Sequence, residues 1–99
     1  MKHILLYLIS GTRGGETRGR IISLLKKTPL NAHRISNVLN LDYKTVQHHL
    51  RVLEKNGLLE VLMKGDYGAM YFLSPELEMN FKEFAEIWDK FGKECGKSS

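Results

Sequence analysis

The stretch that decides the fold is LDYKTVQHHLRVLEKNG, residues 41–57. Its apolar side chains recur at intervals of four and three, the period of one helix face: Val46, Leu50 and Leu53. Asp42 is a favoured N-cap residue, and Gly57 is a favoured C-terminal stop. The stretch therefore predicts a helix that starts after Asp42, ends at Asn56 and turns this apolar stripe inward.

The opposite face of this helix carries hydrogen-bond donors and positive charge. Together with the residues at its N-terminal end, it comprises Tyr43, Lys44, Thr45, Gln47, His48, Arg51 and Lys55. Arg and Lys bind guanine in the major groove, Gln binds adenine, and a Thr methyl contacts the thymine methyl. We expect Lys44, Thr45, Gln47, His48 and Arg51 to contact base edges and Lys55 to contact a phosphate. The same composition also describes an ordinary solvated helix face, so the neighbouring elements must decide.

Two further helices are predicted upstream. The Gly-rich turn 11–15 precedes a helix over 16–27, with Ile21, Leu24 and Leu25 inward, and Thr28-Pro29 ends it. Leu30 is expected to be extended. Asn31 then caps a second helix that carries Ile35, Val38 and Leu39 at helical spacing. The turn 40–42 joins this helix to the next one, which is the helix-turn-helix arrangement.

After Gly57 the pattern is typical of a β-hairpin: residues 58–64 and 69–73 flank the turn sequence GDYG at 65–68. This hairpin is the expected wing. Contacts to a nucleic-acid backbone are expected from the second helix and the wing tip, through Arg34, Lys64 and Tyr67. Arg13, Arg18 and Arg20 are weaker candidates. The fold class is thus mainly α with a small β-hairpin, a winged helix-turn-helix with a three-helix core.

The C-terminal region predicts one more helix, capped by Ser74, with Pro75 as its first residue and an end near Lys93. Its large apolar residues are spaced four, three, four and three, and Ile87 widens the stripe: Leu77, Phe81, Phe84, Trp88 and Phe91. This spacing is typical of a helix-packing seam. We expect a homodimer through this seam, joined by Leu5 and Leu8. The alternative is that the stripe covers its own domain.

The chain therefore divides into four parts. An apolar segment 1–10, strand or helix, is a dimer contact. Residues 11–73 form the winged domain, 74–93 the dimerisation helix and 94–99 a tail.

Composition supports one domain with a polyanionic partner. The 99 residues have a net charge of +4. Through Leu73 there are eleven Lys and Arg against five Asp and Glu, whereas residues 74–99 have four against six, so the basic charge belongs to the winged domain. Cys95 is the single cysteine, which excludes an intrachain disulfide, leaves a bridge between two chains open and fits a cytoplasmic protein. The apolar run 4–9 is too short to span a bilayer, which takes about 20 residues.

Metal and catalytic sites are not expected. His48 and His49 are adjacent, so they point about 100° apart on a helix and do not share one ion readily with His3 or His33. His49 borders the apolar stripe and is expected to be packed and hydrogen-bonded. The sequence has no Gly-rich phosphate loop, nucleophile elbow or HExxH motif. We therefore expect no enzyme activity and no cofactor.

The segment LNAHRISNVLNLDYKTVQHHLRVLEKNGLLEV, residues 30–61, resembles the winged-helix domains of ArsR-type regulators. GTRGG followed by a helix, and then LDYKTVQHHL, is especially similar to archaeal members. The resemblance covers residues 11–73. It implies that the helix matching residues 43–56 enters the major groove and that dimers form through the terminal helices. Many members sense metals through a cysteine pair in the second helix, but residues 31–40 contain no cysteine, which argues against such sensing.

These observations predict a sequence-specific regulator that binds double-stranded DNA as a homodimer on an inverted-repeat operator and represses by occlusion. No small-molecule effector is identifiable. The alternatives are a winged-helix module that binds protein, one that binds RNA, and membrane attachment through residues 4–9.

Overall fold

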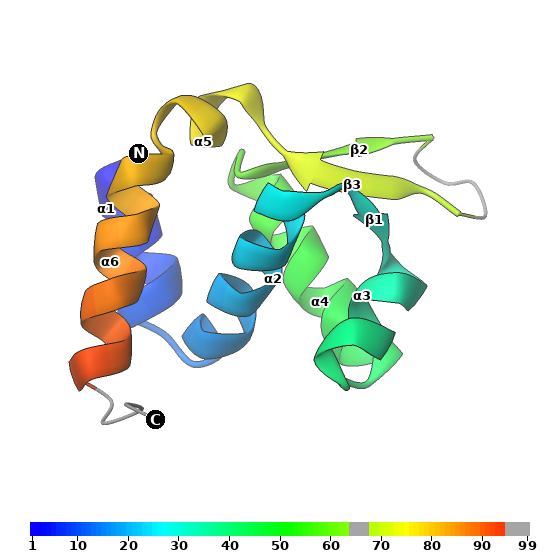
Figure 1. Ribbon diagram of the computed structural model, residues 1–99, viewed down its shortest axis with the longest axis horizontal. Coiled ribbons are helices and arrows are strands. Elements are labelled where there is room, and N and C mark those ends of the chain that lie inside the picture. Colours follow the sequence, from blue (N-terminus) through cyan, green and yellow to red (C-terminus); the bar gives the residue numbers. More distant parts are fainter. Residues whose placement is uncertain (64–67, 95–99) are drawn as a thin grey trace.

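The computed structural model describes residues 1–63 and 68–94 of the chain (Figure 1). The N-terminal half holds helix α1 (Lys2–Leu5), the π-helical turn η1 (Leu6–Ser10), helix α2 (Gly15–Lys27), strand β1 (Leu30–Asn31) and helix α3 (Ala32–Leu39). The C-terminal half holds helix α4 (Tyr43–Lys55), strands β2 (Leu59–Leu62) and β3 (Met70–Leu73), and helices α5 (Pro75–Met79) and α6 (Phe81–Glu94). The three helices expected in the winged domain, the hairpin and the winged helix-turn-helix fold class are confirmed.

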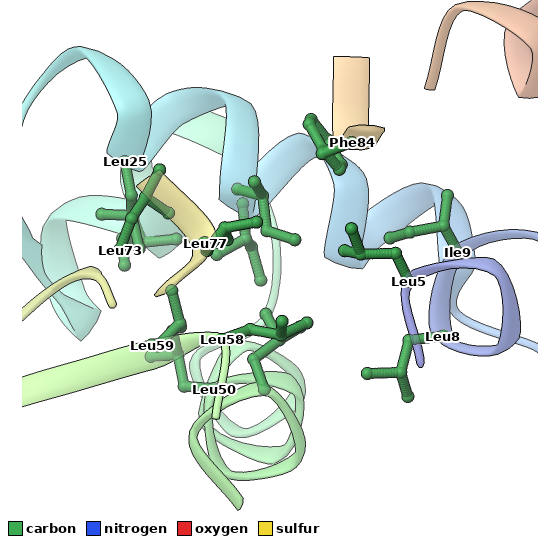
Figure 2. Packing of buried hydrophobic residues seen from close by; sticks show 14 of the residues in the cluster. Leu5, Leu8, Ile9, Leu25, Leu50, Leu58, Leu59, Leu73, Leu77 and Phe84 are labelled. Atoms are coloured by element: carbon green, nitrogen blue, oxygen red, sulfur yellow. The ribbon is translucent and has the colours of Figure 1, made fainter. Parts of the chain in front are cut away.

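The apolar stripe of α4 forms the centre of the core. Val46, Leu50 and Leu53 are each 0% exposed, as their spacing predicted. They pack with buried residues of α2, of α3 and of the segment before β2. Figure 2 shows Leu50 of α4 beside Leu58 and Leu59. This packing fixes which face of α4 remains outside.

One residue of α3 departs from its expected position. Ile35 is 0% exposed and Leu39 is half-buried, but Val38 is 55% exposed. Position 38 lies about 60° around the helix from position 35, on the side away from position 39. The short helix buries a narrow stripe, and Val38 falls outside it.

The described strands form an antiparallel sheet in the order β1, β3, β2. In the hairpin, Leu59 pairs with Leu73 and Leu62 pairs with Met70. Leu30 of β1 pairs with Tyr71 on the other edge of β3. The extended residue expected at Leu30 is therefore one end of a third strand.

The N-terminal segment is helical and covers the core of its own chain. Leu5 and Leu8 are 0% and 3% exposed, and Leu77, Phe84 and Ile87 are 0%, 1% and 7% exposed. Figure 2 shows Leu5 and Ile9 close to Phe84, and Figure 1 shows α1 beside α6. The structure thus differs from the expected dimer interface at these five positions, because α1, η1, α5 and α6 bury these side chains in the core of their own chain.

The C-terminal helix is interrupted, whereas the sequence predicted one continuous helix. Ser74 caps α5 as expected, since its hydroxyl accepts a hydrogen bond from the Leu77 amide at 3.1 Å. The helix stops at Asn80, where φ is −109° and ψ is 19°, and the Asn80 side chain donates to the Glu76 carbonyl at 2.8 Å. The break separates Leu77 from the aromatic residues of the predicted stripe.

Candidate nucleic-acid interface

Two side-chain caps and one left-handed residue mark the start of α3, its end and the start of α4. The Asn31 side chain accepts a hydrogen bond from the Arg34 amide at 2.8 Å. Asn40 ends α3 with φ of 57°, a conformation that Asn tolerates better than most residues. Asp42 then accepts hydrogen bonds from the amides of Lys44 and Thr45 at 3.0 and 3.2 Å. Both predicted caps are confirmed, and with them the start of α4.

The outward face of α4 is a continuous ridge of donors, which we call the α4 ridge. Its members are all exposed: Lys44, Thr45, His48, Arg51 and Lys55. The three cations among them carry positive charge along the whole helix. The Asp42 carboxylate is occupied by the helix N-terminus. The described structure therefore leaves this surface open to an acidic partner.

Tyr43 and Gln47 lie at the margin of the ridge and are half-buried. The Gln47 side-chain amide donates to the Tyr43 hydroxyl at 3.0 Å. The ring of Tyr43 stacks on His33 of α3, with centroids 4.3 Å apart and planes inclined by 12°. This stack brings exposed His33 to the edge of the ridge, a position that the sequence pattern does not predict. No local pattern predicts this contact, which joins two helices.

The other candidate contacts have different positions. Arg34 and Arg13 are exposed, and Arg20 is half-buried and donates to the Leu39 carbonyl at 3.1 Å. Lys64 and Tyr67 lie outside the described residues. Arg18 was expected at the surface, but it is 5% exposed. It is therefore a residue of the interior.

Arg18 lies behind α4 and hydrogen-bonds His49, which was expected to be packed and is 8% exposed. The distance from its Nη1 to His49 Nδ1 is 3.2 Å. Because a guanidinium only donates, Nδ1 must accept, and the imidazole is neutral with its proton on Nε2. Burial, with smaller contributions from the charges of Arg18 and His48, lowers the pKa of His49. Burial also lowers the pKa of Arg18, but guanidinium stays charged.

Within residues 1–63 and 68–94, no group of three or more His, Cys, Asp and Glu side chains is placed to hold a metal ion. No helix there has both the length and the apolar character to cross a membrane. Cys95 lies outside the described residues.

The sequence of the winged domain matches a known family model. Residues 15–61 match the family described as "Bacterial regulatory protein, arsR family". The match lies inside the region 11–73 where the resemblance was noted. No curated protein sequence matches the chain.

Solved structures of transcriptional regulators share the fold. The reduced form of the transcriptional regulator YodB from B. subtilis is 20% identical, with a TM-score of 0.71 over 99% of this chain and 96% of that chain. A transcriptional regulator homologue from Pyrococcus horikoshii OT3 is 22% identical, with a TM-score of 0.65 over 96% and 98%. ZitR from Lactococcus lactis, in complex with DNA, is 18% identical, with a TM-score of 0.63 over 89% of this chain and 62% of that chain.

These similarities establish a shared fold, and the family match over residues 15–61 includes α4. The archaeal affinity stays a prediction. Residues 15–61 are therefore similar to the arsR family of regulatory proteins, within a chain that shares the winged-helix fold of these solved structures.

Proposed function

We propose that the protein is a cytoplasmic transcription regulator that binds double-stranded DNA in a sequence-specific manner and represses by occupying its operator. The observation that carries the proposal is the α4 ridge. Its side chains are exposed while Val46, Leu50 and Leu53 of the same helix are 0% exposed. An α-helix fits the major groove, and Arg, Lys and Thr side chains read base edges there.

The N-terminal half of a recognition helix normally contacts bases. Lys44, Thr45 and His48 lie in that half, and Arg51 follows one turn later on the same face. Tyr43 and Gln47 are held in place by their mutual hydrogen bond. We assign these six residues to base reading, and Lys55 and Arg34 to the phosphate backbone. ZitR, which shares the fold, has been solved with DNA.

The direct test is selection of bound sequences from random duplex DNA, followed by a salt titration of the selected duplex. A symmetric motif bound tightly at moderate salt supports the proposal. Weak, unselective binding that salt abolishes would refute it, because a basic surface alone behaves in this way. Preference for RNA over duplex DNA would favour the RNA-binding alternative. Retained function after the cations of the α4 ridge are neutralised would favour the protein-binding alternative.

Arg51→Ala and Lys55→Ala separate the two kinds of contact. Arg51→Ala is expected to cost about 1–3 kcal/mol and to relax preference at one base pair. Lys55→Ala should weaken binding to all sequences equally and reduce the salt slope by about 0.9. Lys82→Ala removes the same charge from an exposed position of α6 and is the matched control. Equal effects of all three variants would contradict the assignment.

We also propose that the protein is a homodimer through the outer face of α1, η1 and α6. Leu6 and Tyr7 of η1 are 39% and 59% exposed. A groove of about 640 Å³ runs beside them, lined by Lys2, Leu6, Ser10, Glu83, Glu86, Ile87 and Lys90. Lysines and glutamates both line it, so two copies related by a two-fold axis can pair opposite charges.

The carboxylate of Glu83 supports the proposal that a second copy of the chain fills this groove. Its Oε1 atom is buried and has no hydrogen-bond partner within the described part of the chain. A buried acceptor without a partner is costly, and a lysine from a second copy would satisfy it. Half-buried Phe81, Trp88 and Phe91 remain interface candidates. A two-fold dimer would place the two α4 ridges about 34–36 Å apart, which suits inverted half-sites.

Leu6→Glu tests the dimer better than a change at Trp88, whose ring packs against Gly19 inside the chain. Leu6 is exposed, so its replacement leaves the core intact. Sedimentation should show monomers for Leu6→Glu and weaker operator binding. Met79→Glu, at an 86% exposed position of α5, should remain dimeric. A monomeric unmutated protein at micromolar concentration would overturn this part.

A further inference from the structure

Arg18 is a buried cation that connects three segments of the chain. Its Nε donates to the Leu8 carbonyl in the middle of η1 at 2.9 Å. Its Nη2 donates to the Thr12 hydroxyl and, at 2.8 Å, to the Arg13 carbonyl in the loop before α2. Its Nη1 donates to His49 of α4 at 3.2 Å. One side chain thus joins η1, the Gly-rich loop and the back of α4.

Three glycines bring these segments close enough for the connection. A Cβ atom at Gly15 would lie 1.8 Å from the carbonyl oxygen of Ile9 in η1. At Gly19 it would lie 2.2 Å from the Trp88 ring of α6, and at Gly14, where φ is +87°, 2.6 Å from His49 Cε1. The first half of α2 is therefore in direct contact with η1, α6 and α4 together, as its central place in Figure 1 also shows.

The hydrogen bonds of Arg18 fix the orientation of α4 relative to η1 and the Gly-rich loop, which apolar packing alone leaves free. A guanidinium presents five donors in one rigid plane, so its partners are held at set angles. Apolar contacts, by contrast, are non-directional and tolerate small sliding or rotation of a helix. His49 follows His48, a member of the α4 ridge. Any rotation of α4 at His49 therefore turns the ridge by the same angle.

We propose that Arg18 is a positioning residue that sets the angle between the α4 ridge and the α1–η1–α6 layer, and thereby the spacing of half-sites that the dimer accepts. The inference rests on the proposed function, because spacing has meaning only for a dimer on DNA. Neither base nor phosphate is contacted by Arg18. Its role is to transmit the dimer geometry to the reading helix.

Half-site spacing is a sensitive readout of this angle. Inserting one base pair moves a half-site by about 3.4 Å along the duplex and about 35° around it. A rigid dimer loses contacts on one side under that displacement, whereas a dimer whose α4 can rotate recovers some of them. Overall stability alone does not alter the preference among spacings.

The experiment compares affinities for duplexes that carry the selected half-sites at the optimum spacing, at spacings changed by one base pair, and as a single half-site. The variants are Arg18→Met, Arg18→Lys and His49→Leu. His49→Leu breaks the same link from the α4 side, while the guanidinium keeps its hydrogen bonds to Leu8, Thr12 and Arg13. His49→Asn keeps an acceptor near the position of Nδ1 and serves as the conservative rescue. Lys26→Met is the matched control on α2, since Lys26 pairs with Glu78 of α5 at 2.8 Å.

The unmutated protein and Lys26→Met should prefer the optimum spacing by about tenfold or more, the size of one lost base contact. His49→Asn should keep the preference. In Arg18→Met and His49→Leu the preference should fall to about threefold or less, with single half-site affinity changed by less than about twofold. Arg18→Lys, which keeps charge without the planar donor set, should lie between.

The proposal is overturned if either Arg18→Met or His49→Leu keeps the preference for the optimum half-site spacing. A parallel loss of single-site and two-site affinity in the folded variants also overturns it, because that pattern marks a purely structural residue. Failure of the proposed function is visible separately, since the unmutated protein then selects no motif at all.

Discussion

Replacing Gly19 with alanine is expected to destabilise the protein, although alanine ordinarily stabilises a helix. Gly19 lies inside α2, and a Cβ atom there would meet three atoms of the Trp88 ring at 2.2, 2.4 and 2.7 Å. The ring has little freedom to retreat. It stacks between Phe84 and Phe91 of α6, with centroid distances of 6.0 and 5.5 Å.

Two opposing terms set the size of the effect. Alanine in place of glycine in a helix interior gains about 1 kcal/mol. Overpacking of a tight contact costs about 1–3 kcal/mol, and three ring atoms inside contact distance place Gly19→Ala at the upper end. The expected net loss is therefore about 2 kcal/mol, which lowers the Tm of a domain of this size by about 8–16 °C.

The assay is thermal and urea unfolding of Gly19→Ala beside Gly92→Ala. Gly92 lies in α6 with nothing within 4 Å of a Cβ atom, so alanine there should leave stability unchanged or increase it. The double variant Gly19→Ala with Trp88→Ala should show a favourable coupling energy, since removing the ring removes the clash. A Tm for Gly19→Ala at or above that of the unmutated protein would refute the reasoning.

Two further predictions concern α4. Asp42→Ala removes the acceptor for the Lys44 and Thr45 amides and should lower the free energy of unfolding in urea by about 1 kcal/mol. Asp42→Asn should retain most of the stability. Equal urea midpoints for Asp42→Ala and the unmutated protein would contradict the role of Asp42 as a cap. Burial, with Arg18 and His48, lowers the pKa of His49 from 6.5, so the folded protein binds this proton less readily than the unfolded chain. The contribution of His49 to the free energy of unfolding should be fully present above pH 6.5 and should be lost as the pH falls through the lower folded-state pKa. His49→Asn should remove this part of the pH dependence. Identical pH profiles for His49→Asn and the unmutated protein would exclude the role of His49.

Much of the fold was predictable because it depends on local pattern. The stripe of α4 is buried where its period placed it, and the caps at Asn31, Asp42 and Ser74 start the helices they were predicted to start. Helix period and capping are properties of a few neighbouring residues, so they can be identified in a sequence. The exposure of the α4 ridge follows from the same period.

The remaining features depend on contacts between distant residues. Leu30 becomes a strand because it meets Tyr71 on the free edge of β3, and nothing near Leu30 predicts that partner. Leu5 and Phe84 were assigned to a dimer interface, but the structure buries them against each other's helices and α2. The spacing of apolar residues identifies the apolar face of a helix, but it does not identify which residues cover that face.

The sequence by itself determined which face of α4 is apolar and which is cationic, because the helix period divides one from the other. Only the tertiary structure decided that Arg18 is internal: its carbonyl, hydroxyl and imidazole acceptors come from Leu8, Thr12, Arg13 and His49, and they meet only when α2 lies between η1 and α4. The physical reason is that burial of a charge requires acceptors from several segments at once, and no single stretch of sequence contains them.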